Sequence, residues 1–362
     1  MIQKILEKLI SFKTISGNHL ENKKALEGIK NQIKHLPVYI TEFESNGFSS
    51  LVITTQKNKQ PIIWLQAHLD VVSGATQAFC PQVVNKRLYG RGAIDMKFAI
   101  ACYIKLLKDL DKNLPKYNFG IMITTDEEIG GFNGVKFLLD KGFSSKVCFL
   151  PDGGKNWQFI KTSKGIWDLS IQSKGKSSHA ARPWLGQNAL NELIDFLNEL
   201  RKKFPQEPCH IKDHYHETFN IGKITGGNVA NQVPDFAEAL VDIRFTPKMN
   251  KVKLQKIIDL SIKNFRNIKI KEIFFHDSFA INPENYYVQL FSQIAYEKLK
   301  IKTTFINTPG SSDACFFIQK NIPVVMIRPN GGNFHADNEW VDLQGLEKYY
   351  LIVKDFTEKI AK

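Results

Sequence analysis

Ile62-Ile63-Trp64-Leu65-Gln66-Ala67-His68-Leu69-Asp70 is the stretch of sequence that decides the fold. It begins as a short apolar run, which is typical of a buried β-strand, and it ends in a histidine and an aspartate. Other apolar runs lead into acids or a histidine in the same way. They are residues 119–123 before Glu127 and Glu128, 147–150 before Asp152, and 323–327 before His335.

Helical patterns lie between these runs, as in residues 96–110, where Cys102, Leu106 and Leu110 fall on one face. Strands that alternate with helices predict an α/β fold with a mixed, largely parallel sheet flanked by helices. In open sheets of this kind the ligand crevice lies beyond the carboxyl ends of the strands. We therefore expect the acids and histidines to meet at one edge of the sheet, with Asp95 at the start of the helix that follows it.

Residues 165–275 have a different texture. They contain a strand-like alternation at 167–173, two further strands at 219–225 and 238–245, and helices at 188–204 and 251–265. This order predicts an α+β sandwich inserted into the first domain. The expected organisation is a discontinuous catalytic domain of residues 1–164 and 276–362, with the insert 165–275 as a second domain.

Composition and cysteine usage are those of an ordinary globular chain. Hydrophobic residues make up 43% of the 362 residues, and apolar runs stay well short of a membrane span. Residues 1–16 read as an amphipathic helix and not as a signal peptide, whose apolar segment would be uninterrupted. The five cysteines are scattered and odd in number, which predicts reduced thiols in a cytoplasmic protein.

The net charge of +13 raises the question of nucleic-acid binding. Of the 49 cationic side chains, 42 are lysines, and they are spread along the chain. Arginine-rich runs, finger-type Cys/His spacing and base-stacking motifs are absent from the sequence. We therefore interpret the positive charge as lysines on the solvated surface, and we predict no nucleic-acid or membrane partner. Arginine is rare, and four arginines lie in or beside the motifs: Arg91, Arg182, Arg244 and Arg328. At such positions a rigid, planar guanidinium can form two hydrogen bonds to one carboxylate.

The residue types at the strand ends indicate metal chemistry. A mixture of carboxylates and imidazoles suits zinc, with cobalt or manganese as substitutes. Each motif alone is weak evidence, because a His-x-Asp pair is commonly just hydrogen-bonded and an Asp after a strand is commonly a helix cap. A second cluster, His210, His214 and His216, lacks comparable acids and is interpreted as surface.

In this combination the sequence resembles the co-catalytic zinc aminoacylase and carboxypeptidase family, which includes succinyl-diaminopimelate desuccinylase, acetylornithine deacetylase, glutamate carboxypeptidase, and di- and tripeptidases. The resemblance covers almost the whole chain. It implies two divalent ions, one bound by His68 and Asp152 and the other by Glu128 and His335, with Asp95 bridging them. Asp70 resembles the carboxylate that orients His68, and Glu127 resembles the general base.

The insert resembles the family's lid and dimerisation domain. Ser178-His179-Ala-Ala-Arg182-Pro is similar to the segment whose histidine reaches the partner subunit's site in a homodimer and stabilises the oxyanion. Substrate-contacting residues implied by the resemblance are Arg182, Asn228, Asn231, Arg244, Gly310, Ser311 and Ser312. Of these, Arg244 resembles the arginine that binds a substrate carboxylate. The resemblance also implies a cis peptide bond between Asp95 and Met96.

The predicted function is hydrolysis of an amide bond in a small N-acyl amino acid or dipeptide with a free carboxylate. The compact length and the motif around Asp95 favour a deacylase or desuccinylase. Asp152 favours a dipeptidase or aminopeptidase, because in the family glutamate at this position accompanies the deacylases. A catalytically silent binding protein is the remaining alternative. The retention of Glu127 and of all the metal ligands argues against it.

Overall fold

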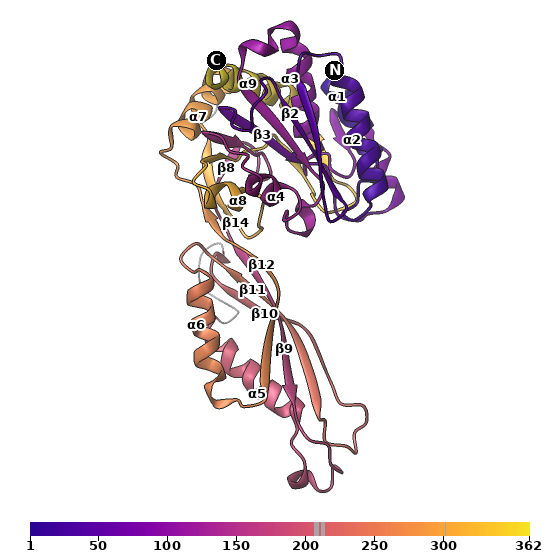
Figure 1. Ribbon diagram of the computed structural model, residues 1–362, viewed down its shortest axis with the longest axis vertical. Helices are drawn as coiled ribbons and strands as arrows, with labels where there is room; N and C mark the ends of the chain where they lie inside the picture. The colour runs from indigo at the N-terminus through magenta and orange to yellow at the C-terminus, as the bar shows by residue number, and fades with distance from the viewer. Residues whose placement is uncertain (206–209, 211–213, 301) are drawn as a thin grey trace. The chain divides into compact units, whose positions relative to one another are not determined.

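The computed structural model describes residues 1–205, 210, 214–300 and 302–362 (Figure 1). They form two compact units. The first unit consists of residues 1–161, 281–306 and 312–362, and the second of residues 162–280 and 307–311. The units therefore change within a few residues of the expected boundaries at 164/165 and 275/276.

A six-stranded sheet forms the centre of the first unit, in the order β1-β2-β6-β3-β7-β15. Its strands are β1 (Tyr39–Ser45), β2 (Phe48–Thr54), β3 (Ile63–His68), β6 (Phe119–Thr124), β7 (Val147–Phe149) and β15 (Val324–Val325). The neighbours β6, β3, β7 and β15 run parallel to one another. Strand β2 runs antiparallel to both of its neighbours, β1 and β6. The predicted mixed α/β fold is thus confirmed.

Helices cover this sheet because each presents a buried apolar stripe. The helices of the first unit are α1 (Ile2–Ile10), α2 (His19–Ile33), α3 (Lys97–Leu110), α4 (Val135–Asp140), α7 (Tyr286–Leu299), α8 (Ala314–Gln319) and α9 (Leu343–Ala361). Helices α3 and α9 pack against β3, and α1 and α2 pack on α3. The start of α2 is fixed by Asn18, whose side chain accepts a hydrogen bond from the Glu21 N–H.

The second unit is built on a four-stranded antiparallel sheet in the order β10-β11-β9-β12. Its strands are β9 (Gly165–Lys174), β10 (Thr218–Gly226), β11 (Phe236–Phe245) and β12 (Ile268–His276). Helices α5 (Ala189–Arg201) and α6 (Lys251–Ser261) lie on one face of this sheet (Figure 1). Buried side chains such as Leu169, Phe196 and Val241 form the core between sheet and helices.

One detail of the second unit differs from the sequence-based expectations. Strand β12 was not predicted, because a register shift between Glu272 and Phe274 interrupts its alternation of apolar and polar residues. Strand β9, which contains the 167–173 alternation, lies between β11 and β12 within its sheet. The described edges of this sheet are β10 and β12.

Smaller sheets complete the described chain. One has the order β13-β8-β14, with β8 (Gln158–Ser163), β13 (Phe279–Ala280) and β14 (Thr304–Thr308). Another has the order β16-β17-β5-β4, with β4 (Gln82–Val84), β5 (Arg87–Tyr89), β16 (Gly331–Gly332) and β17 (Trp340–Asp342). The second of these ties the segment before Asp95 to the segment around His335.

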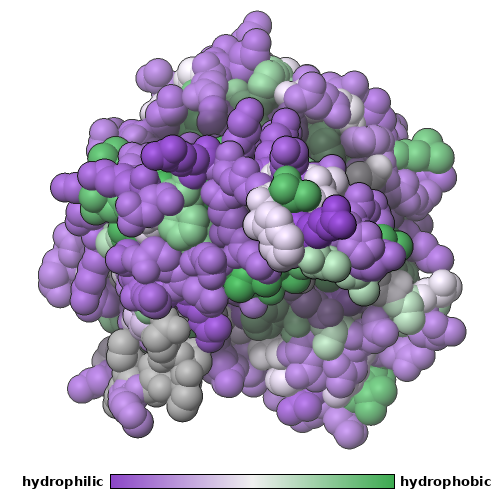
Figure 2. Space-filling model, turned by 90° about the horizontal axis from the view of Figure 1, so that it is seen from below, coloured by the Kyte–Doolittle hydropathy of each residue, from purple (hydrophilic) through white to green (hydrophobic). Residues whose placement is uncertain are grey.

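The surface agrees with the lysine-rich composition. Figure 2 shows one face of the molecule on which hydrophilic residues dominate and hydrophobic residues gather in small groups. None of the helices in the described ranges is long and apolar enough to cross a membrane. Cys80, Cys102 and Cys148 are free thiols, as predicted, and Cys209 lies outside the described residues.

The close packing between two neighbouring strands of the central sheet, β3 and β6, gives a test of the fold. A Cβ at Gly120 would lie 2.1 Å from the ring of Trp64, which is fully buried. Gly120→Ala should therefore lower the free energy of unfolding by about 2 kcal/mol, because an overpacked core forces its neighbours to move. Gly28→Ala is the matched control, since its Cβ would meet only Phe12 at 3.5 Å in a helix. Equal denaturant midpoints for the two variants would contradict this packing.

Candidate metal centre

The expected metal ligands come from the carboxyl ends of adjacent strands. His68 is the last residue of β3, and Glu128 lies in the 3₁₀ turn η3 (Glu127–Ile129) after β6. Asp152 follows β7, and His335 lies after β15 and the short strand β16, in the loop before β17. Because β6, β3, β7 and β15 are parallel neighbours, these loops leave the sheet at the same edge.

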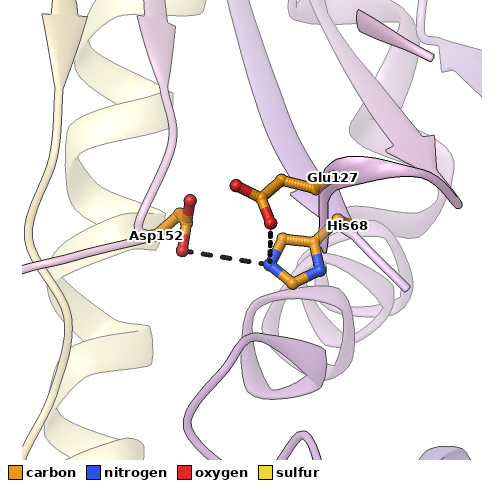
Figure 3. A group of neighbouring side chains, drawn as sticks. All are labelled: His68, Glu127 and Asp152. Carbon is orange, nitrogen blue, oxygen red and sulfur yellow. Dashed lines mark ion pairs between the residues drawn. The ribbon is translucent and has the colours of Figure 1, made fainter. Parts of the chain in front are cut away.

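The first group of possible ligands is His68, Glu127 and Asp152 (Figure 3). Nε2 of His68 lies 3.9 Å from a carboxylate oxygen of Glu127 and 3.9 Å from one of Asp152. In Figure 3 both carboxylates point towards the same imidazole nitrogen. One nitrogen and two oxygens thus converge on one small volume.

The second group is Asp95, Glu128 and His335. Nε2 of His335 lies 3.3 Å from Oε2 of Glu128 and 3.2 Å from Oδ2 of Asp95. The other oxygen of Asp95, Oδ1, lies 3.5 Å from Nε2 of His68. Asp95 therefore directs one oxygen to each group, as a bridging carboxylate must. The expected cis peptide between Asp95 and Met96 is confirmed.

The electrostatics of the site are those of concentrated negative charge. Hydrogen bonds that the His335 imidazole donates to the carboxylates of Asp95 and Glu128 raise the pKa of His335 to about 10. Burial opposes a charge on His68, but Asp152 and Asp95 outweigh it and raise its pKa well above its usual range. Burial and the nearby Asp152 raise the pKa of Glu127. The carboxylates therefore favour a cation between them.

The donor set fits divalent metal ions. Nε2 of His68 is buried and has no hydrogen-bond partner among the described residues, although a buried imidazole nitrogen normally has one. It faces carboxylate oxygens from both groups, and nitrogen with oxygen donors is the set that zinc, cobalt and manganese accept. Ions in both groups would satisfy this nitrogen and offset the mutual repulsion of the acids.

Asp70 acts differently from a simple orienting carboxylate. Nδ1 of His68 lies 2.9 Å from the main-chain oxygen of Asp70 and 3.6 Å from its carboxylate. The carboxylate instead accepts hydrogen bonds from the backbone N–H groups of Glu127 and Glu128 and from the hydroxyl of Ser16. Asp70 thus fixes the His68 ring through its backbone and the η3 turn through its side chain.

Glu339 and Arg91 form a buried clamp that was not predicted from the sequence. Glu339 is fully buried and accepts hydrogen bonds from the backbone N–H groups of Gly92, Ile94 and Asp95. Its carboxylate also pairs with Arg91 at 3.2 Å. Arg91 in turn donates to the main-chain oxygens of His335 and Ala336. The clamp therefore joins the Asp95 loop to the His335 loop.

The loop of residues 310–313 is divided between exposed and buried positions. Gly310 is exposed and Ser311 is half-buried, and both belong to the second unit. Ser312 is buried in the first unit, where its hydroxyl contacts the Asp152 carboxylate. Ser312 is thus in a position to support a candidate ligand, and its expected contact with the substrate stays a prediction.

Most of the expected substrate residues of the second unit gather at one end of its sheet. His179 is exposed and pairs with Gln232 in an isolated bridge, and the Ala180 N–H donates to the Asn231 main-chain oxygen. Asn228 and Arg182 are also exposed in these two loops. Nδ1 of His179 accepts a hydrogen bond from the Ala181 N–H at 3.1 Å, which leaves Nε2 as the outer nitrogen.

Arg244 lies at the other end of the same sheet. It is near the carboxyl end of β11, whereas Phe236 at the amino end pairs with Lys174, just before the His179 loop. Eight residues of strand separate Arg244 from Phe236, which corresponds to roughly 27 Å. Within one chain, Arg244 and His179 are thus too far apart to bind the same small substrate.

The second histidine cluster is only partly at the surface. His210 and His214 are exposed, as expected. His216 is instead buried, and its Nδ1 lies 2.7 Å from the main-chain oxygen of Glu217. Residues 211–213, between His210 and His214, lie outside the described residues.

Residues 64–359 match the model of Peptidase family M20/M25/M40. The chain belongs to this family. Succinyl-diaminopimelate desuccinylase of Rickettsia akari is 27% identical over 98% of both chains. The enzyme of the same name from Pelagibacter ubique is 30% identical, over 83% of this chain and 84% of its own.

Solved structures of the M20 family show the same fold. An aminopeptidase from Bacillus cereus superimposes with a TM-score of 0.78 at 18% identity, over 100% of this chain and 98% of that one. An M20 metallo-carboxypeptidase from Sulfolobus solfataricus gives 0.77 at 17% identity, over 99% and 98%. The chain is therefore a hydrolase of amide bonds in a metal-dependent family, and it carries two candidate metal-binding groups.

The clamp leads to a prediction about metal affinity. In Glu339→Gln an amide NH₂ replaces one oxygen and faces backbone N–H donors, so the loop that carries Asp95 should loosen. Metal titration should show affinity reduced about 10- to 100-fold with the fold retained. Asp337→Asn is the control, since it also removes a charge beside Arg91 but makes no contact with the 92–95 loop. Unchanged affinity in Glu339→Gln would rule out the positioning role.

Proposed function

We propose that this M20 hydrolase cleaves the amide bond of a small N-acyl amino acid or dipeptide that carries a free carboxylate. The observation that supports this is the bridging position of Asp95 between His68 and His335, beside the uncommitted carboxylate of Glu127. The desuccinylase relatives, similar over almost their whole length, favour a deacylase over a peptidase.

In the proposed site, His68 and Asp152 hold one ion, Glu128 and His335 hold the other, and Asp95 bridges them. Zinc is the proposed metal, with cobalt or manganese as substitutes. When bound, such ions polarise the scissile carbonyl and lower the pKa of water from 15.7 to about 7. The remaining chemistry belongs to side chains of the protein.

Glu127 is the proposed general base. Its backbone N–H is held by Asp70, and its carboxylate faces the His68–Asp152 side of the site. Burial and Asp152 raise the pKa of Glu127, so its carboxylate is a better proton acceptor than an exposed glutamate. Glu127 takes a proton from the attacking water and then delivers it to the leaving amine. The products are a carboxylic acid and an amine.

His179 is proposed to stabilise the oxyanion from the partner subunit of a homodimer. The separation of His179 from Arg244 along the second unit supports this role, because the two residues can serve one substrate only if they come from different chains. Arg244 would then bind the substrate carboxylate, and Asn228, Asn231 and Arg182 would contribute from the loops beside His179. The exposed strand edges β10 and β12 leave the second unit able to pair with another copy.

A dipeptidase or aminopeptidase is the second candidate, and Asp152 is the observation that favours it. Aspartate has a shorter side chain than the glutamate that accompanies deacylases. Tripeptidase and dipeptidase structures also share this fold, although likeness at 20% identity and below concerns the fold alone. A catalytically silent binding protein is a remote alternative, because Glu127 and the ligand groups are all present.

The proposed activity is tested with matched N-succinyl, N-acetyl and dipeptide substrates. Zinc-loaded protein should hydrolyse at least one class, and a chelator should abolish turnover. Glu127→Gln should reduce kcat by at least about 100-fold because the proton transfer is lost. Its metal content should be unchanged, because in the proposed site Asp95, and not Glu127, completes the ligand set of His68 and Asp152.

Two outcomes would count against this function. Activity in Glu127→Gln within a few-fold of wild type would mean that another group is the base. A wild-type protein that binds metal but cleaves none of the three classes would favour the binding-protein alternative. Cleavage of dipeptides alone would select the second candidate.

The in-trans role of His179 is tested by complementation. Inactive Glu127→Gln protein is mixed with inactive His179→Ala protein under conditions in which subunits exchange. Heterodimers would contain one site with both residues intact, so activity should rise towards a quarter of the wild-type value at equal mixing. A fully active chain that sediments as a monomer at assay concentration would exclude the in-trans role.

A further inference from the structure

Arg328 is a half-buried arginine of the first unit that none of the proposed steps uses. It follows β15 in the segment that leads to His335. Its Nε donates a hydrogen bond to the main-chain oxygen of Gly154 at 2.6 Å, and Gly154 lies two residues after Asp152. Its guanidinium also lies over the ring of Phe334, 4.7 Å from the centroid, and Phe334 precedes His335. Arg328 is thus anchored to both loops that carry candidate ligands.

The anchoring leaves one edge of the guanidinium free. With Nε bound to Gly154 and the flat face on Phe334, the outer edge consists of Nη1 and Nη2. Neither atom has a hydrogen-bond partner in the part of the chain that the structure describes. Arg244, by contrast, is held by Asp242 through Nε and Nη2. A guanidinium whose orientation is fixed and whose Nη edge is open is prepared to bind a carboxylate with two parallel hydrogen bonds.

The charge of Arg328 reaches the metal centre. Burial favours the neutral form of Asp95, but His335, His68 and, with a smaller contribution, Arg328 lower the pKa of its carboxyl well below the usual range. The anchors of Arg328 also lie close to the candidate ligands in sequence, Gly154 two residues after Asp152 and Phe334 next to His335, so an anion on Arg328 would lie beside the loops that carry them. Since Arg328 belongs to the ligand loops themselves, this position suits the part of the substrate that stays beside the scissile carbonyl.

We propose that Arg328 is a specificity residue that binds the terminal carboxylate of a dicarboxylic acyl group such as succinyl. This inference rests on the proposed function, in which Arg244 takes the carboxylate of the amino-acid part. An N-acetyl group has no terminal carboxylate and would leave Arg328 unused.

The activity test compares Arg328→Gln with wild type on an N-succinyl amino acid and on the N-acetyl derivative of the same amino acid. For the succinyl substrate kcat/KM should fall about 10- to 100-fold, mainly through KM, because a charge-assisted pair is lost. For the acetyl substrate kcat/KM should change less than about threefold. Arg87→Gln is the matched control. Arg87 is exposed and stacks on Trp340, so this substitution removes the same charge at a different place on the protein. Equal losses on both substrates, or no loss on either, would overturn the proposal.

A binding test separates this inference from the proposed function. Calorimetry on the zinc-loaded protein compares succinate with succinamate, which has the same shape but a neutral amide at one end. Wild type should bind succinate at least about tenfold more tightly, and Arg328→Gln should lose this preference. Arg328→Lys keeps the positive charge but lacks the planar guanidinium, so it should retain only part of the preference for succinate. This variant replaces Arg328→Gln in the test if the glutamine variant does not fold. If wild type cleaves no N-acyl amino acid but prefers succinate through Arg328, the proposed function fails and the anion site stands. Equal binding of the two ligands overturns the anion site.

Discussion

The ion pair between Arg91 and Glu339 is the constraint on which the arrangement of the site depends. One carboxylate accepts backbone N–H groups from three residues of the loop that carries Asp95, while its partner guanidinium holds main-chain oxygens of the loop that carries His335. Both side chains are almost completely buried, so water does not compete for these bonds. Two loops that are more than 200 residues apart in sequence are thereby held as one piece.

This rigidity matters because the residues of the site repel one another. Asp95, Glu127, Glu128 and Asp152 bring four carboxylates together, and burial raises the pKa of three of them while the neighbouring imidazoles hold that of Asp95 down. Left to themselves, like charges in a low dielectric move apart or take up protons. Backbone N–H groups of these loops, which donate hydrogen bonds to the carboxylates of Asp70 and Glu339, oppose that movement. The fold therefore keeps the acids in place ready for cations, and cation binding in turn stabilises the fold.

The sequence predicted the parts of this structure that depend on regular local patterns. The buried runs that become β3, β6, β7 and β15 each lead to a candidate ligand, so the strand pattern alone placed His68, Glu128, Asp152 and His335 at one sheet edge. The hairpin of β1 and β2 was missed, although its turn contains Asn46-Gly47, a pair that favours the positive φ angles seen there. Such a turn is a local signal that could have been used.

Other features depend on contacts that leave no periodic trace. Glu339 lies in a polar loop, and its importance comes from backbone groups far away in sequence. The burial of Ser312 against Asp152 depends on a loop that is distant in sequence. The bulged strand β12 takes its place in the sheet by pairing with β9, which is also far away in sequence. In each case the deciding partner is distant in sequence, and one sequence alone does not identify it.

The unequal exposure of the two imidazoles would make ions in the two candidate groups kinetically distinct. The His68 side chain is 1% exposed, whereas that of His335, on a backbone with a φ of 65°, is 49% exposed. An ion coordinated by His335 would meet water and chelators directly, while one coordinated by His68 would have to leave past Asp95. Loading and loss would then follow an order, with the outer position filled last and emptied first. Mild chelation would yield a protein with a single ion, in which Asp95 holds that ion with one oxygen and offers the other to solvent.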